Sequence, residues 1–161
     1  MPAPVPITLP SHASILTGTN PVYHGAHDNG LYRVAPDNET LAEILSAHGY
    51  STAAFVSGYP LIRRFGLDQG FDHYDDDLEG DDLYSWTALA PKKNANQMAE
   101  RPADVTTRAV VSWFEGAREP FFAWIHYFDP HHSHQPPPPY NDIFFDHLYD
   151  GEIAFVDEQF G

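Results

Sequence analysis

Apolar residues recur at helical spacing in one early segment of the chain. They lie between Leu41 and Leu45, after polar residues 37–39, whose composition is typical of a helix start. Gly49 follows, and glycine commonly ends helices because it adopts the left-handed backbone conformation. The pattern therefore predicts a helix over residues 37–49.

Short continuous apolar runs follow two of the predicted helices. Residues 52–56 form the first run, and it predicts a buried strand. A second helix is predicted over 102–118, followed by a buried strand over 121–125, and a last helix over 149–160. The apolar face of the second helix contains Val105, Ala109, Val110, Trp113 and Phe114, and that of the last helix contains Tyr149, Ile153, Val156 and Phe160.

Helices that alternate with buried apolar strands are typical of an α/β fold with a largely parallel sheet. Two strands are few for such a sheet, and both ends of the chain stop where another strand is expected. We therefore expect residues 1–161 to form a single partial domain. Acidic residues crowd between Asp72 and Asp82, and we expect the segment 72–101 to be a surface excursion.

The charge of the chain excludes one class of function. The chain has 8 Lys and Arg residues against 23 Asp and Glu residues, which gives a formal net charge of −15. A surface that binds the phosphate backbone of a nucleic acid is therefore not expected. The acidity fits either a solvated surface or adaptation to high salt. No run approaches the roughly 18 apolar residues of a membrane span, and residues 1–6 lack the features of a signal peptide. Without Cys, disulfides and thiol catalysis are excluded.

Candidate chemistry begins at Thr8. A hydroxyl group just ahead of a short helix that starts near Pro10 lies in the positive field of the helix end, where an oxyanion is stabilised. Thr8 is therefore a candidate nucleophile for attack on phosphorus or sulfur. The alternative is that Thr8 or Ser11 only caps the helix, a common role for these residue types.

The whole string around Thr8 resembles the nucleophile segment of the alkaline phosphatase superfamily, which includes the sulfatases and the nucleotide pyrophosphatase/phosphodiesterases. The string runs from Thr8-Leu9-Pro10-Ser11-His12 through Thr17-Gly18, Pro21 and His24-Gly25 to Asp28-Asn29. The resemblance implies an α/β/α sandwich in which Thr8 is a covalent nucleophile and a metal ligand. Sulfatases carry a convertible Cys or Ser at that position, whereas the phosphodiesterase branch carries an unmodified Thr.

The same resemblance assigns roles to two further residues. His12 would contact the substrate, and Asn29 would donate a hydrogen bond to a non-bridging oxygen of the substrate, as in an oxyanion hole. From the residues alone, Asn29 beside Gly30 is a turn signal.

Further segments are similar to sulfatases along most of the chain. These are residues 41–52, Gly70-Phe71-Asp72 and residues 121–131, where the resemblance implies that His131 contacts the substrate. One departure concerns the Gly-Lys-Trp-His string of sulfatases, which is replaced here by Ser57-Gly58-Tyr59-Pro60. The sulfate-binding Lys and His of that string therefore have no counterpart in this chain.

Two stretches suggest metals by composition. The string Asp129-Pro130-His131-His132-Ser133-His134 offers ligands that suit Zn²⁺ or Mn²⁺, although adjacent His residues seldom point at one ion; we favour His131 as a substrate contact, with His132 and His134 exposed. Asp75, Asp77, Glu79 and Gly80 fit half of a calcium loop, but Trp86 stands where the bidentate Glu is required, so a solvated loop is the better interpretation.

The resemblance implies a metal-dependent hydrolase of sulfate or phosphate esters, with Zn, Mn or Ca as the divalent metal. It places the other metal ligands on a strand before the nucleophile and on one well after Ile153, yet no Asp precedes Asp28 and no Asp-His-Gly string follows Ile153. We therefore expect this chain alone to be inactive and to bind no metal tightly. The expected partner is a small anionic ester. The alternative is a non-catalytic sulfatase-like scaffold or binding module. Oligomeric state and compartment stay open, although the family resemblance suggests a periplasmic or extracytoplasmic location.

Overall fold

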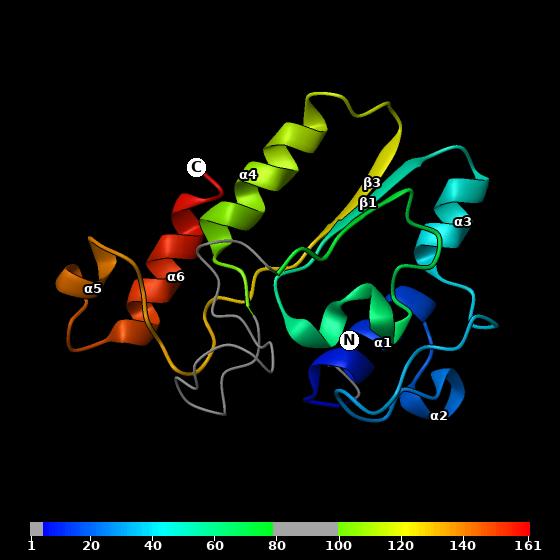
Figure 1. Cartoon of the computed structure of the whole chain (residues 1–161), viewed down its shortest axis with the longest axis horizontal. Coiled ribbons are helices and arrows are strands. Elements are labelled where there is room, and N and C mark those ends of the chain that lie inside the picture. The colour runs from blue at the N-terminus through cyan, green and yellow to red at the C-terminus, as the bar shows by residue number, and fades with distance from the viewer. Residues whose placement is uncertain (1–4, 79–99) are drawn as a thin grey trace.

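The computed structural model describes residues 5–78 and 100–161. Helices precede, separate and follow three strands, and 3-10 turns follow the first strand (Figure 1). In chain order the elements are α1 (Thr8–Thr17), α2 (Pro21–His24), α3 (Leu41–Ala47), β1 (Ser51–Phe55), η1 (Tyr59–Leu61), η2 (Arg63–Phe65), β2 (His73–Asp75), α4 (Ala103–Phe114), β3 (Phe121–Ile125), α5 (Tyr140–Ile143) and α6 (Leu148–Glu158).

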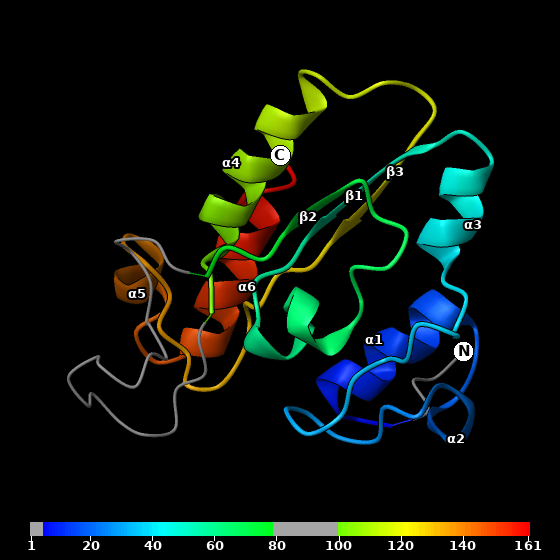
Figure 2. The same ribbon diagram turned by 45° about the vertical axis from the view of Figure 1, so that its right-hand side comes forward.

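The three strands form one parallel sheet in the order β2-β1-β3 (Figure 2). Ala53 at the centre of β1 is paired with His73 of β2 and with Ala123 of β3. Because every neighbour is parallel, the carboxyl ends of all three strands meet at one edge. The α/β fold with a parallel sheet, predicted from the apolar pattern, is confirmed.

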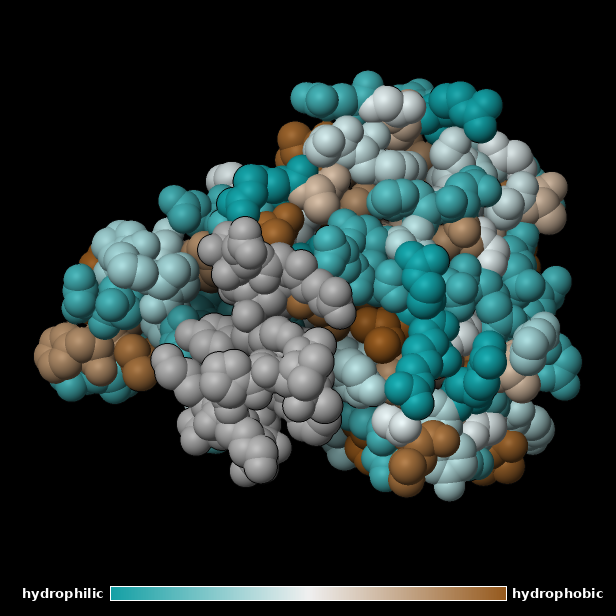
Figure 3. Space-filling model, viewed as in Figure 1, coloured by the Kyte–Doolittle hydropathy of each residue, from teal (hydrophilic) through white to brown (hydrophobic). Residues whose placement is uncertain are grey.

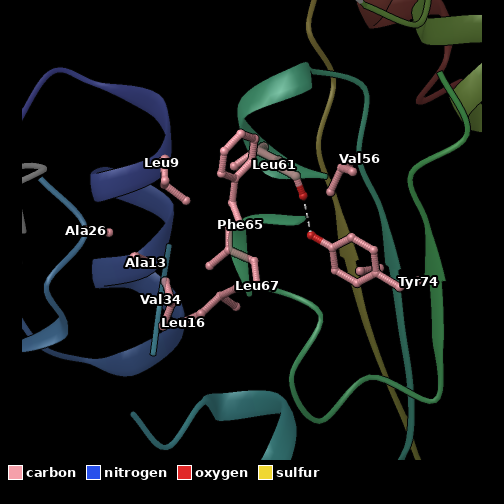
Figure 4. Close-up of a cluster of buried hydrophobic side chains, with 11 residues drawn as sticks. Leu9, Ala13, Leu16, Ala26, Val34, Val56, Leu61, Phe65, Leu67 and Tyr74 are labelled. Atoms are coloured by element: carbon pink, nitrogen blue, oxygen red, sulfur yellow. Dashed lines mark hydrogen bonds between the residues drawn. The ribbon is translucent and has the colours of Figure 1, made fainter. Parts of the chain in front are cut away.

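Successive residues of β1 are buried on opposite faces of the sheet, as strand geometry requires. Ala53 and Phe55 pack with Val110 of α4 on one face. Ala54 and Val56 belong to the larger cluster on the other face, which includes three residues of α1 (Figure 4). Helices thus cover both faces of the sheet, as in an α/β/α sandwich. The larger cluster consists of Leu9, Ala13, Leu16, Ala26, Val34, Ala54, Val56, Leu61, Phe65, Leu67 and Tyr74.

Two helix starts differ from the predictions. The first helix begins at Thr8, two residues before Pro10, with Ile7 as its N-cap residue. The helix predicted over 37–49 is α3, and its N-cap is Thr40, whose hydroxyl accepts from the Glu43 N–H at 3.2 Å while the Glu43 carboxylate accepts from the Thr40 N–H at 2.8 Å. This reciprocal capping box satisfies two helix-end donors, which the polar residues 37–39 do not.

The described ends of the segment 72–101, which is predicted to be a surface excursion, pack against the rest of the fold. Its first residues form β2, and the Asp72 carboxylate accepts from the Thr52 N–H at 3.1 Å. Asp75 forms a 2.7 Å ion pair with Arg101, whose side chain is almost fully buried. Residues 79–99, which include Glu79, Gly80 and Trp86 of the stretch interpreted as a solvated loop, lie outside the described residues.

Apolar surface is scattered in small groups on the face shown in Figure 3, including the α5 end, where Ile143 and Phe145 are exposed. Among the described parts of the chain, none of the helices combines the length and the hydrophobicity that crossing a bilayer requires.

Candidate active site

The first helix meets the end of β3 through the side chain of His12. The His12 ring lies 5.5 Å from the Trp124 ring and 5.0 Å from the ring of His126, measured between centroids. Trp124 is in β3, and His126 is the first residue after it. Thr8 lies one helical turn before His12 and therefore on the same side of α1. Two of the predicted site residues are thus positioned at the carboxyl edge of the sheet, where parallel sheets commonly bind ligands.

Asn29 is bonded to the first turn of α1. Its side-chain Oδ1 accepts from the Leu9 N–H at 2.8 Å, which satisfies one of the free donors at the helix start. The N-cap residue is Ile7, and no side chain of the N-cap forms a capping hydrogen bond. Neither Thr8 nor Ser11 is therefore the helix cap that the alternative proposed. Asn29 also occupies the predicted turn, since Gly30 has a φ of 81°. With Oδ1 used as an acceptor, the donor capacity of the Asn29 side chain resides in its Nδ2 group.

Burial keeps the two facing histidines uncharged at neutral pH. Loss of hydration lowers the pKa of His12 from 6.5 to about 4, and it lowers the pKa of His126 to about 3, with a further decrease from the charge of His12. The His12 Nδ1 atom is buried and has no hydrogen-bond partner among the described residues. Both rings can donate or accept hydrogen bonds, but neither provides a positive charge for an anionic substrate.

Ser57 fixes the orientation of His126. The Ser57 hydroxyl donates to the His126 carbonyl oxygen, and Oγ lies 3.3 Å from the His126 Nδ1 atom. Because the hydroxyl proton is used by the carbonyl, Nδ1 must be the donor to Oγ. The Nε2 atom of His126 then carries the lone pair. The residue after Ser57 is Gly58, and there is little room for a side chain there, since an added Cβ would lie 2.9 Å from the Phe128 ring.

His131 lies further along the same loop and is exposed. Its ring packs on Phe128 with a centroid distance of 4.3 Å, and its Nδ1 atom is 2.8 Å from the His132 carbonyl oxygen. The rings of Phe128 and His126 both lie beside Gly58, and the Phe128 ring contacts that of His131. His126 thus connects the α1 part of the site to His131.

A second Ser and His pair, Ser14 with His24, is structural. The Ser14 hydroxyl donates to the Pro10 carbonyl at 2.9 Å, and the same oxygen lies 2.9 Å from the His24 Nε2 atom. His24 Nδ1 accepts from the Ala26 N–H at 3.2 Å, so Nε2 carries the proton and donates to Ser14. A base that activates Ser14 would need a lone pair on Nε2, and this tautomer lacks it.

The family model for sulfatases matches residues 3–161. The chain belongs to the sulfatase family. A solved structure with the same fold is that of BT4656 in complex with its substrate D-glucosamine-2-N,6-O-disulfate, with a TM-score of 0.61 and 24% sequence identity. The match covers 87% of this chain and 28% of the BT4656 chain. A comparison with curated proteins finds no significant match.

The metal expected from the sulfatase family is not matched by a set of ligands within the described parts of this chain. No group of three or more His, Asp or Glu residues there is arranged to hold a metal ion. In the string 129–134, which has metal-binding composition, Asp129 accepts from the Ala103 N–H and His134 pairs with Glu152. The role of Thr8 as a metal ligand stays a prediction.

The sequence analysis missed His126 and Ser57. His126 directly follows β3 and Ser57 comes two residues after β1, and polar residues at the carboxyl ends of parallel strands are strong candidates for a site in an α/β fold. His126 lies within the segment 121–131 that is similar to sulfatases, and Ser57 begins the string that departs from them, but neither position had a role implied by the resemblance. The position after each predicted strand was the signal that could have identified them.

Proposed function

We propose that this chain carries the nucleophile segment of a metal-dependent hydrolase of sulfate or phosphate esters, with Thr8 as the covalent nucleophile. The observation that carries the proposal is the 2.8 Å hydrogen bond from the Leu9 N–H to Asn29 Oδ1. It joins the expected oxyanion contact to the residue next to the expected nucleophile. Membership of the sulfatase family supports the same reaction class.

The proposed reaction has two steps that share the Thr8 oxygen. In the first, Oγ1 gives its proton to water and bonds to sulfur or phosphorus, while the ester oxygen leaves with its electron pair and takes up a proton from water. In the second, water attacks the same centre and releases Thr8 together with sulfate or phosphate. The Asn29 amide donates to a non-bridging oxygen, and the start of α1 adds a favourable field for the developing negative charge.

The neutral histidines would act in this reaction by hydrogen bonding. His12 and His126 are deprotonated well below neutral pH, because burial lowers the pKa of both rings. His131, exposed on the following loop, is the proposed substrate contact. The described residues bring together no set of metal ligands, so no step is assigned here to a metal.

Two ester classes fit the proposal, for different reasons. Thr cannot be converted to the aldehyde nucleophile of sulfatases, which favours phosphate esters on chemical grounds. BT4656 has a disulfated glucosamine as its substrate, and that supports testing sulfated sugars as well. Both classes share an anionic tetrahedral centre that Thr8 would attack.

The test compares Thr8→Ala with Thr17→Ala, a matched change at the other end of α1. We expect the 161-residue chain to give no Thr8-dependent turnover of nitrophenyl sulfate or nitrophenyl phosphate esters, even with excess Zn²⁺, Mn²⁺ or Ca²⁺. In a protein extended by the flanking coding sequence, we expect turnover that Thr8→Ala abolishes and Thr17→Ala retains. The loss should be on the order of a thousandfold or more, as for removal of a covalent nucleophile.

The outcomes separate the two functions that the sequence left open. Turnover that survives Thr8→Ala in the extended protein would assign the nucleophile to another residue. An extended, folded protein with no turnover on any of these esters would favour the non-catalytic scaffold. Thr8-dependent turnover by the 161-residue chain itself would support the nucleophile and contradict the expected inactivity of the isolated chain.

A further inference from the structure

The loop that carries His131 is held at both ends by carboxylates, of which Asp129 is half-buried and Glu152 is buried. At its start, the Asp129 Oδ2 atom accepts from the Ala103 N–H at 2.9 Å, which ties the loop to the first turn of α4. At its end, Glu152 of α6 uses both oxygens: Oε2 is 2.9 Å from His134 Nδ1, and Oε1 accepts from the Gln135 N–H at 2.6 Å. His131 lies between these two attachment points.

The attachment of the loop to α6 is made by a buried side chain. Glu152 is only 3% exposed, although it is charged and belongs to an acidic chain. Gly151, the residue before it, lets Pro136 lie against the helix, since a Cβ there would lie 2.9 Å from the Pro136 ring. A buried carboxylate is retained at low energetic cost only when its hydrogen bonds are satisfied, and the loop provides them.

Glu152 lies outside the proposed reacting groups. Its two bonds go to the segment directly after His131, and burial, together with the charge of Glu152, raises the pKa of Asp129 to about 6. The groups that face this region are Glu100 before α4, Asp129 and His134 on the loop, and Glu152 on α6. The direct bonds of Glu152 go to the second attachment point, at His134 and Gln135.

We propose that Glu152 is a positioning residue that holds the loop of residues 129–136 on α6. It thereby sets the position of His131, the proposed contact for the anionic substrate. The proposal rests on the proposed function through the role of His131. It makes α6 part of the site, although no residue of this helix belongs to the motifs of the resemblance. The side chain acts on the substrate only through His134, Gln135 and the loop.

The test measures the attachment of the loop and the binding of an anion at His131 separately. Amide hydrogen exchange reports the Gln135 N–H, and the imidazole NMR signals of His131 report titration with inorganic phosphate. We expect Glu152→Ala to speed exchange at Gln135 by about tenfold or more, as for loss of one hydrogen bond to a charged group. We expect the same variant to weaken phosphate binding at His131 severalfold. Asp157→Asn, an exposed acidic position on the same helix, should change neither.

Glu152→Gln keeps the volume and one acceptor oxygen, and it provides the readout if Glu152→Ala fails to fold. Its phosphate affinity should lie between those of the wild type and Glu152→Ala. Unchanged exchange at Gln135 in the Glu152 variants overturns the attachment. Faster exchange with unchanged phosphate affinity overturns the positioning role and leaves Glu152 structural. A wild type in which phosphate does not perturb His131 overturns the inference too, while Thr8-dependent turnover still decides the proposed function independently.

Discussion

Ser57 and His126 constrain each other at the carboxyl edge of the sheet. The Ser57 hydroxyl is both the donor to the His126 carbonyl and the acceptor for the His126 Nδ1–H. One side chain thus fixes the loop backbone and the tautomer together. This arrangement leaves Nε2 of His126 as an acceptor, whatever the pH above about 4, because burial lowers the pKa of the ring to about 3.

Replacing Ser57 with Ala should therefore disturb stability and tautomer at once. We expect Ser57→Ala to lower the free energy of unfolding by about 1–2 kcal/mol, because a buried carbonyl and a ring N–H lose their partner. The ¹⁵N signals of His126 should change from one tautomer to a mixture. Urea denaturation and imidazole NMR measure the two effects. Ser112→Ala, an exposed serine of α4, should stay within about 0.5 kcal/mol of the wild type. A single unchanged tautomer in Ser57→Ala would show that another group orients the ring.

At the scale of elements, the start of α1 depends on a residue twenty positions away. Asn29 provides the side-chain acceptor that the N-cap residue Ile7 does not provide. The same bond fixes the turn at Gly30 against the helix, so the expected nucleophile and the expected oxyanion contact are held by one interaction.

Two substitutions at Asn29 separate the structural role from the proposed chemical role. Asn29→Ala removes the acceptor, and we expect a loss of about 1 kcal/mol in stability and faster exchange of the Leu9 amide. Asn29→Asp keeps an acceptor and adds a charge that the helix start favours, so stability should be retained. Both variants lack the Nδ2 donor and should lose turnover in the extended protein. Thermal unfolding, amide exchange and ester hydrolysis check these points; full turnover in Asn29→Asp would contradict the oxyanion role.

The longer elements were predictable because their apolar spacing is set by local geometry. The predicted strand over 121–125 is β3 residue for residue. The helices predicted over 102–118 and 149–160 are α4, over Ala103–Phe114, and α6, which begins one residue earlier than predicted and ends at Glu158. The strand β2 was not predictable from pattern, since it has three residues and only Tyr74 among them is buried. Its pairing depends on β1, which is a tertiary contact that no local pattern encodes.

The residues of the site likewise divide into those predictable from local sequence and those that depend on tertiary contacts. Thr8, His12, Asn29 and His131 are recognisable as parts of strings that resemble a family. The partners of His126 and Glu152 are not recognisable, because their bonds join distant parts of the chain. Ser57 is 69 positions from His126, and Glu152 is 18 and 17 positions from its two partners on the loop. Such pairs follow from the packing of α6 and β1 against the loop after β3, and the sequence contains no local sign of it.

At the scale of the whole molecule, two sets of titrating groups oppose each other. His12 and His126 have a pKa lowered by burial to about 4 and about 3, so the stability they contribute is present above pH 6.5 and is lost as the pH falls below it. Burial and neighbouring charges raise the pKa of Glu100 to about 7 and that of Asp129 to about 6. Their contribution is present below pH 4 and is lost as the pH rises toward those values.

Between about pH 4.5 and 6.5 the histidines make the protein more stable with rising pH and the two carboxyls make it less stable, so the wild-type curve should be flat there. The double variant Glu100→Gln with Asp129→Asn removes only the second effect, and Asn keeps an oxygen for the Ala103 N–H. We expect its free energy of unfolding to rise over this window by about 1–3 kcal/mol more than that of the wild type. Urea denaturation at four pH values measures the slopes, with Asp157→Asn as the control. Parallel curves for the double variant and the wild type would mean that the buried carboxyls do not oppose the histidines.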